Sequence, residues 1–212
     1  MGMSVNPAAP TLQFWFEFAS TYSYLTAMRI EEEAALAGVG VEWRPFLLGP
    51  IFRQQGWTDS PFNLYPAKGR YMWQDVARQA RKYGLPLVRP SAFPRNGLTA
   101  ARIACSHADA PWMPGFVRAV YRANFARDLD IASDAVIAAC LADVGQDPDA
   151  VLAAARDPVA KQALAARTEE AAALGVFGAP SFIAGGELFW GDDRLHDALA
   201  HCVASASRRA PA

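Results

Sequence analysis

The strongest constraint on the fold is that β-type patterns occur only near the two ends of this 212-residue chain. Near the N-terminus, residues 11–18 are rich in aromatic side chains and predict a strand, residues 22–36 have helical spacing, and residues 39–46 alternate like a second strand. A strand, a helix and a strand within about 36 residues form a βαβ unit, in which the two strands are parallel.

The C-terminal end predicts a β-hairpin followed by a helix. Residues 181–184 and 187–189 flank a Gly-Gly dipeptide, which is typical of a tight hairpin turn. A final helix is expected from residue 192 or 193 to 203, and residues 204–212 are expected to form a frayed tail. The two β-containing ends can share a sheet only in three dimensions, so we predict an α/β fold whose sheet is split by a helical insertion.

A helical stretch of about 120 residues lies between these ends. Apolar spacing and capping residues predict helices at residues 68–83, 98–107, 112–125 and 134–144, and two more that begin at Asp147-Pro148 and Asp157-Pro158. The last of them ends near Gly175, and Ser133 is expected to cap the helix at 134–144. The segment where this helical stretch begins, residues 46–65, is rich in aromatic and turn residues.

Composition excludes several classes of protein. Hydrophobic residues make up 52% of the chain and charged residues 19%, which excludes a disordered protein. A formal net charge of −1 gives no reason to expect a nucleic acid or a lipid surface as partner. Residues 1–10 lack the features of a signal peptide, and no apolar stretch reaches the roughly 20 residues that span a bilayer. We therefore expect a soluble cytoplasmic protein with reduced thiols.

The cysteines and histidines do not form a recognisable redox or metal site. Cys105, Cys140 and Cys202 are far apart and include no CxxC pair, which argues against a dithiol centre and against cysteine-ligated zinc. We expect them to be small buried side chains. The three histidines lack metal-ligand spacing, so we expect no metal site and give them surface or capping roles.

Two positions are candidates for chemistry. Ser20 precedes the first helix, where a serine most often caps the helix by accepting a hydrogen bond from the amide of Tyr22 or Ser23. The same position suits a second role, because a helix N-terminus stabilises an anion such as a thiolate, to which the hydroxyl can donate. Pro180, at the start of a hairpin strand, marks either an edge or bend, or a cis-proline beside a ligand.

The motifs around these positions resemble one family. They are residues 16–25 (FEFASTYSYL), residues 175–182 (GVFGAPSF) and residues 189–195 (FWGDDRL). From about residue 11 to 203, the chain resembles 2-hydroxychromene-2-carboxylate isomerases, which are similar to kappa-class glutathione transferases and, more distantly, to DsbA-type oxidoreductases. The resemblance implies a thioredoxin-like domain at residues 11–47 plus 168–204, with an all-helical insertion domain at residues 48–167.

The resemblance also implies that Ser20 is the catalytic residue, which orients and activates the thiol of bound glutathione. Ser20 matches the first serine of the family's Ser-Pro-Tyr/Phe-Ser pattern, in which Thr21 here replaces the proline. Ser20 and Ser23 stand where a disulfide oxidase requires two thiols, which excludes that activity. The sulfur must therefore come from outside the chain, and glutathione is the implied cofactor.

Five further residues are implied to bind glutathione. Pro180 matches the family's cis-proline, which leaves the backbone of Ala179 to bind the cysteinyl part. Asp193 and Arg194 match a pair near the γ-glutamyl end, and Lys68 matches a glutathione-binding lysine. From the sequence alone, Asp193 is equally an ordinary helix-start acid, and Lys68 is more often a solvated first-turn lysine.

Four residues are candidates for the wall of a pocket that binds a flat aromatic substrate: Trp57, Asn63, Tyr65 and Asn96. An alternative explanation applies to each of them. Aromatic side chains in this segment can simply pack between the insertion helices and the sheet. The two asparagines suit turns, most clearly Asn96, which precedes a glycine.

The activity implied by the resemblance is that of a glutathione-dependent isomerase of an aromatic-derived acid. The thiolate adds reversibly to an activated double bond, rotation follows, and glutathione is regenerated. Two alternatives stay open: a kappa-like transferase or peroxidase that consumes glutathione, and a glutathione-binding protein without catalysis. Members of the family are commonly dimers, so the resemblance implies a homodimer.

Overall fold

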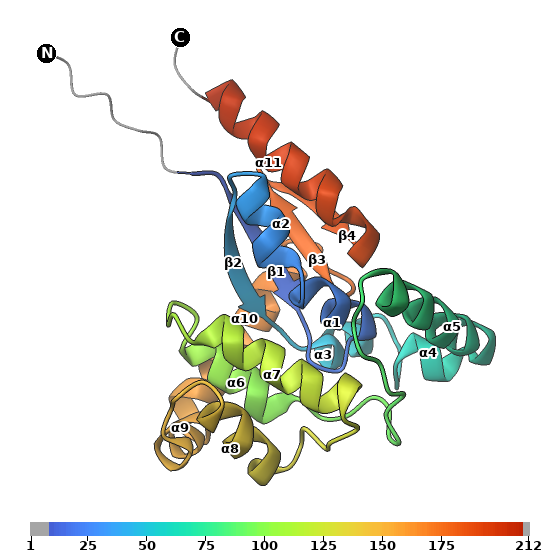
Figure 1. The fold of residues 1–212 in the computed structure, drawn as a ribbon, viewed down its shortest axis with the longest axis vertical. Helices are drawn as coiled ribbons and strands as arrows, with labels where there is room; N and C mark the ends of the chain where they lie inside the picture. The colour runs from blue at the N-terminus through green and yellow to red at the C-terminus, as the bar shows by residue number, and fades with distance from the viewer. Residues whose placement is uncertain (1–8, 210–212) are drawn as a thin grey trace, which may run out of the picture.

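The computed structural model describes residues 9–209 and shows one four-stranded sheet with helices around it (Figure 1). The strands are β1 (Thr11–Phe16), β2 (Gly40–Pro45), β3 (Ser181–Ala184) and β4 (Glu187–Trp190), and their order in the sheet is β2-β1-β3-β4. β1 and β2 are parallel, whereas β3 is antiparallel to both β1 and β4. The predicted βαβ unit and the hairpin are confirmed, and β1 joins them into one sheet.

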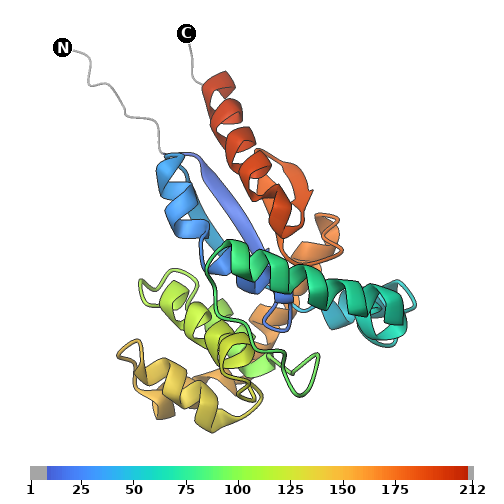
Figure 2. The ribbon, with the colours of Figure 1, turned by 45° about the vertical axis from the view of Figure 1, so that its right-hand side comes forward.

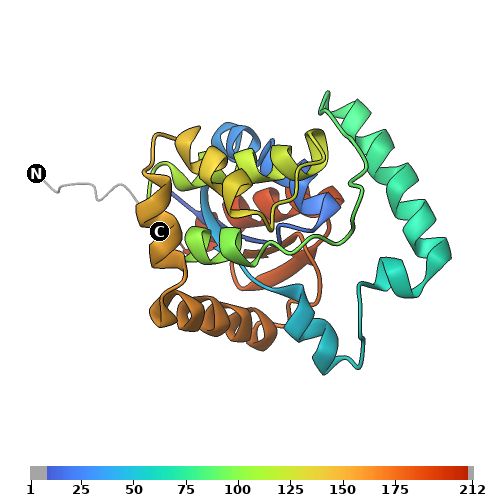
Figure 3. The same ribbon diagram turned by 90° about the horizontal axis from the view of Figure 1, so that it is seen from below.

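The helices have the following bounds: α1 Thr21–Ala27, α2 Ile30–Leu36, α3 Leu48–Gln54, α4 Pro61–Leu64, α5 Pro66–Lys82, α6 Leu98–Ser106, α7 Met113–Ala126, α8 Asp134–Ala142, α9 Pro148–Ala155, α10 Pro158–Ala173 and α11 Leu195–Arg209. A short 3₁₀ helix, Asp192–Arg194, leads into α11. Figures 2 and 3 show α4 and α5 on one side of the molecule, away from α8 and α9. Within residues 9–209, no helix has both the length and the apolarity that crossing a membrane requires.

Both faces of the sheet are buried because side chains along β1 alternate between them. Phe14 and Phe16 are fully buried in the larger core, where they pack with residues of α1, α7 and α11. Trp15 is buried on the opposite face with Phe46 and with Val176, which follows α10. The carboxyl end of β1 is therefore enclosed between two helical layers, and the chain leaves it directly into α1.

Two predictions about secondary structure are wrong. The helix expected at residues 22–36 is two helices, because Arg29 leaves the helical conformation where its guanidinium bonds to Asp192. The frayed tail expected from residue 204 is helical through residue 209, since Ser205 is buried where it packs beside the hairpin glycine Gly185. The aromatic-rich segment 46–65, which belongs to the predicted helical stretch but for which no individual helix was named, contains α3 and α4.

The predicted division into two domains stays a prediction. α10 runs without interruption across the expected boundary between residues 167 and 168. The larger core is also continuous from Phe16 of β1 to Tyr121 and Phe125 of α7. Residues 1–8 and 210–212, which carry most of the segment judged to lack a signal peptide and the end of the expected tail, lie outside the described residues.

Candidate active site

Ser20 lies between the carboxyl end of β1 and α1, and it caps the helix as predicted. Its backbone is extended (φ −76°, ψ 117°), and its Oγ accepts a hydrogen bond from the amide of Ser23 at 3.1 Å. The same hydroxyl donates to the carbonyl oxygen of Ala179 at 2.9 Å. Ser20 therefore links the start of α1 to the segment before β3, which is distant in sequence but adjacent in space.

The segment before β3 has the conformation that the resemblance implies. The peptide bond between Ala179 and Pro180 is cis. The carbonyl of Pro180 accepts a hydrogen bond from the amide of Gly191 at 3.0 Å, so the two C-terminal motifs lie side by side. The aromatic rings of Phe177 and Trp190, one from each motif, pack with centroids 4.9 Å apart, and each is about half exposed.

A cavity of about 1410 Å³ opens beside Ser20. Seven of the ten predicted site residues line it: Ser20, Trp57, Lys68, Asn96, Ala179, Pro180 and Asp193. Asn63, Tyr65 and Arg194 do not. Asn63 bonds to Asp59 and to the carbonyl of Phe93, Tyr65 is half exposed with its ring 4.7 Å from the Lys68 ammonium, and Arg194 pairs on the surface with Asp193 and Asp197.

Asn96 combines the two roles that were weighed for it. Its side-chain oxygen accepts a hydrogen bond from the amide of Leu98 at 2.9 Å, which is a local turn contact, and the residue also lines the cavity. Its neighbour Gly97 packs so tightly that an added Cβ would lie 2.6 Å from the Cβ of Phe18. The loop that carries Asn96 is thus pressed against the chain just before Ser20.

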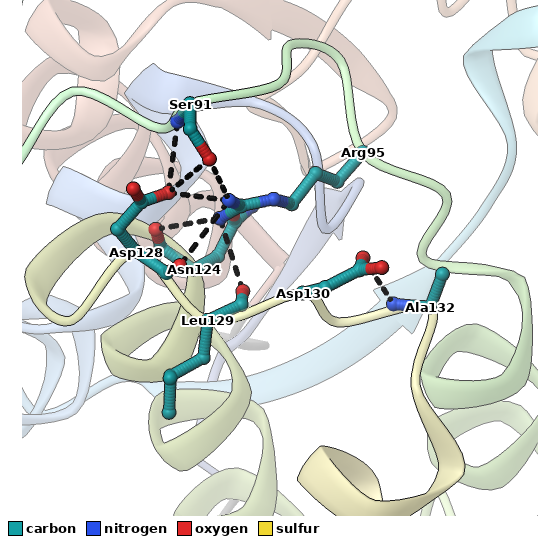
Figure 4. Close-up of polar contacts among 7 residues, drawn as sticks. All are labelled: Ser91, Arg95, Asn124, Asp128, Leu129, Asp130 and Ala132. Carbon is teal, nitrogen blue, oxygen red and sulfur yellow. Dashed lines mark hydrogen bonds and ion pairs between the residues drawn. The ribbon is translucent and has the colours of Figure 1, made fainter.

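Arg95 fixes this loop, and nothing in the sequence pattern indicated it. Its guanidinium is buried and donates to the side chains of Ser91, Asn124 and Asp128 and to the carbonyl oxygens of residues 124, 128 and 129 (Figure 4). Asn124 in turn donates to the carbonyl of Phe18 at 3.2 Å. Hydrogen bonds from Ser91 and Arg95 lower the pKa of the Asp128 carboxyl.

A second buried network holds the other side of the cavity. The carboxylate of Asp192 is buried, and its Oδ1 accepts hydrogen bonds from Arg29 and from Thr26, each at 2.8 Å. The Tyr83 hydroxyl donates to its Oδ2 at 3.4 Å. These contacts attach the 3₁₀ helix to α1, to the residue before α2 and to the residue after α5. They thereby position the neighbouring Asp193, whose own side chain is exposed at the cavity.

Glu17 is the cavity residue of greatest chemical interest that sequence reasoning missed. It lines the cavity, and its Oε2 accepts a hydrogen bond from the amide of Ala19 at 2.9 Å. Burial raises the pKa of the Glu17 carboxyl to about 7, although the amide hydrogen bond from Ala19 opposes this. The available signal was an acidic residue at the end of an aromatic strand, directly before the candidate serine.

Charges of both signs surround the cavity. Asp75, Asp192 and Asp193 supply carboxylates, whereas Arg53 and Lys68 supply cations that form no ion pair within residues 9–209. In the same part of the chain, no group of three or more His, Cys, Asp and Glu side chains is placed to hold a metal ion. Cys140 and Cys202 are buried, as expected, whereas Cys105 is only partly buried, and burial raises the pKa of each thiol.

Comparison with known proteins identifies the family. Residues 11–202 match the model of the DSBA-like thioredoxin domain. A 2-hydroxychromene-2-carboxylate isomerase of Sphingobium xenophagum is 30% identical over 187 residues, which cover 87% of this chain and 94% of that protein. A kappa 1 glutathione S-transferase of Caenorhabditis elegans is 25% identical, over 90% of this chain and 89% of its own length.

A solved structure supports the fold. A 2-hydroxychromene-2-carboxylate isomerase superposes with a TM-score of 0.82 at 23% identity, over 95% of this chain and all of that chain. The predicted thioredoxin-like fold with its helical insertion is therefore confirmed. The chain belongs to the DSBA-like thioredoxin family, in the group that contains 2-hydroxychromene-2-carboxylate isomerases and kappa-class glutathione transferases.

Proposed function

We propose that this protein is a glutathione-dependent isomerase of the 2-hydroxychromene-2-carboxylate type. The observation that carries the proposal is the Ser20 hydroxyl, held between the amide of Ser23 and the carbonyl of Ala179 at the wall of a large cavity. The segment Ser20–Ser23, at the start of α1, has serine at both positions where a disulfide oxidase has cysteine. The sulfur for any thiol chemistry here must therefore come from a ligand.

The cavity residues fit glutathione by charge and by hydrogen-bonding capacity. Glutathione carries an ammonium group, two carboxylates, two amide bonds and a thiol. Asp193 offers a carboxylate for the ammonium group, and Lys68 offers a cation for a carboxylate. The carbonyl of Ala179 has two lone pairs, so it can accept an amide N–H of the ligand beside or in place of the Ser20 hydroxyl.

Ser20 would orient and stabilise the sulfur. Its hydroxyl proton can rotate from the Ala179 carbonyl toward a thiolate, while its lone pair continues to accept from Ser23. Bound glutathione would supply a nucleophilic thiolate for reversible addition to an activated carbon–carbon double bond. Trp57 and the aromatic pair Phe177 and Trp190 offer flat apolar surface for a ring-containing substrate beside Ser20.

The test is a spectrophotometric isomerase assay with 2-hydroxychromene-2-carboxylate and glutathione. We expect turnover that requires glutathione but leaves the total thiol concentration unchanged. Ser20→Ala and Ser20→Asn should both abolish turnover, although asparagine preserves the helix cap. Full activity of both variants would show that Ser20 serves only as the N-cap of α1. Stoichiometric loss of thiol would instead favour a kappa-like transferase, and glutathione binding without turnover would favour a non-catalytic protein.

Several other expectations are not tested by the fold or by the relatives. The homodimer, the cytoplasmic location and the lack of nucleic-acid and membrane partners stay predictions. So do the individual roles of Lys68, Asp193 and Arg194 in binding glutathione. Arg194 is the weakest of these, because its guanidinium is engaged by Asp193 and Asp197 and the residue does not line the cavity.

A further inference from the structure

The chemistry proposed for Ser20 leaves one proton without a destination. Forming a thiolate from a thiol releases a proton, and Ser20 cannot take it. The Ser20 oxygen already accepts a hydrogen bond from the amide of Ser23, and its own proton is needed as donor to the sulfur. A separate proton acceptor in the same cavity would keep this proton within the site.

Glu17 has the position and the free lone pairs for this role. It lies three residues before Ser20, whose amide donates to the Glu17 carbonyl at 3.0 Å, and both residues line the cavity. One carboxyl oxygen, Oε2, is anchored by the amide of Ala19. The other, Oε1, makes no hydrogen bond within residues 9–209 and is not among their fully buried unpaired atoms, so it keeps free lone pairs and some accessible surface.

In the part of the chain that the structure describes, Glu17 has no basic partner that would hold its carboxylate ionised. From α7, the Tyr121 hydroxyl donates to the main-chain carbonyl of Glu17 at 2.9 Å, and its own pKa is raised well above the usual value by burial and by the Glu17 charge. From the chain after β1, the amide of Ala19 donates to the Glu17 carboxyl group and the amide of Ser20 donates to the Glu17 main-chain carbonyl. Among residues 9–209, no lysine, arginine or histidine forms an ion pair with Glu17.

We propose that Glu17 takes up the proton that the glutathione thiol loses beside Ser20 and returns it when the thiol forms again. The S–H bond breaks, an O–H bond forms on the Glu17 carboxylate, and the site keeps one negative charge throughout. A thiolate and a carboxylate that line the same cavity would repel each other, so this transfer favours the thiolate. A carboxyl that titrates near neutrality can both accept and return the proton. The inference rests on the proposed binding of glutathione.

The experiment counts the protons released when glutathione binds. Calorimetric titrations at pH 8 in two buffers of different ionisation enthalpy give that number, and the ultraviolet absorbance of thiolate reports ionisation of the sulfur. We expect the wild type to form thiolate with almost no net proton release. Glu17→Gln, which keeps an acceptor for the Ala19 amide, should release more protons, with a difference of roughly 0.5 to 1 per glutathione. Glu32→Gln, an exposed residue of α2, is the matched control and should behave like the wild type.

A second measurement needs no variant. Difference infrared spectra of the wild type at pH 8 should show a protonated carboxyl band that appears when glutathione binds. Equal proton release by the wild type and Glu17→Gln, with thiolate present in both, would overturn the role of Glu17 alone, as would the absence of that band. Failure of the wild type to bind glutathione would overturn the proposed function itself, and the role of Glu17 with it.

Discussion

The Glu17 carboxyl makes the stability of this protein depend on pH in a direction opposite to that of a salt-bridged acid. Its pKa is raised by burial from an ordinary value of 4.5 to about 7 in the folded state. Between these values the folded protein binds more protons than the unfolded chain, so the free energy of unfolding falls as pH rises. The loss begins near pH 4.5 and is complete above about pH 7.

The size of the effect follows from the two pKa values. At about 1.4 kcal/mol for each tenfold change, a pKa raised from 4.5 to about 7 corresponds to about 3 kcal/mol of lost stability at pH 8. Glutamine at position 17 cannot ionise and still accepts from the Ala19 amide. Glu17→Gln should therefore be more stable than the wild type by up to about 3 kcal/mol at pH 8, and nearly equal to it at pH 4.5.

Urea denaturation followed by tryptophan fluorescence at both pH values measures this difference. Parallel denaturation of Glu32→Gln shows what the loss of an exposed carboxylate does on its own. The reasoning would be refuted by a stability difference between Glu17→Gln and the wild type that is the same at both pH values. A wild type that is the more stable protein at pH 8 would refute it more strongly, because Glu17 would then be stabilised as an anion.

Three further substitutions test how the cavity is built. Arg95→Met should lower the free energy of unfolding, measured by urea denaturation, by about 2 kcal/mol or more, because it leaves buried acceptors unpaired. It should also raise KM, because the loop that forms part of the substrate wall becomes less rigid. Unchanged stability would show that the network is dispensable. Gly69→Ala should lower Tm, since its Cβ would lie 2.2 Å from the backbone oxygen of Phe62, and a wild-type Tm would show that α4 and α5 separate easily. Gly178→Ala should instead leave Tm nearly unchanged but alter KM. The added Cβ would lie 2.3 Å from the indole of Trp190, and this half-exposed side chain can move away. An unaltered KM would show that Trp190 does not take part in substrate binding.

The features that could be predicted from the sequence are those set by neighbours in the chain. Asp147 and Asp157 cap their helices through amides two residues ahead, as a local pattern predicts. The hairpin turn at Gly185 and Gly186 has positive φ at both glycines, which that dipeptide allows. Ser133 precedes its helix as expected, but its side chain makes no capping bond, so the position was right and the contact was not.

The features that could not be predicted depend on partners far apart in sequence. Nothing near Arg29 shows that it will end a helix in order to bond with Asp192. Likewise, the structural role of Arg95 depends on hydrogen-bond acceptors at residues 124–129, which come close to its guanidinium only in the folded chain. For the same reason, the sequence placed Ser20 at the site but could not show that Glu17 would share its cavity with a raised pKa.

The central claim is that Ser20 stabilises a glutathione thiolate, and thiolate absorbance at pH 7 tests it most directly. Free glutathione is only slightly ionised at this pH, since an ordinary thiol has a pKa of about 8.5. We predict that the wild type produces thiolate absorbance when it binds glutathione, and that Ser23→Ala, a matched change in the same turn but outside the cavity lining, retains it. Ser20→Ala should bind glutathione without that absorbance. Equal thiolate absorbance in Ser20→Ala and the wild type would contradict the account.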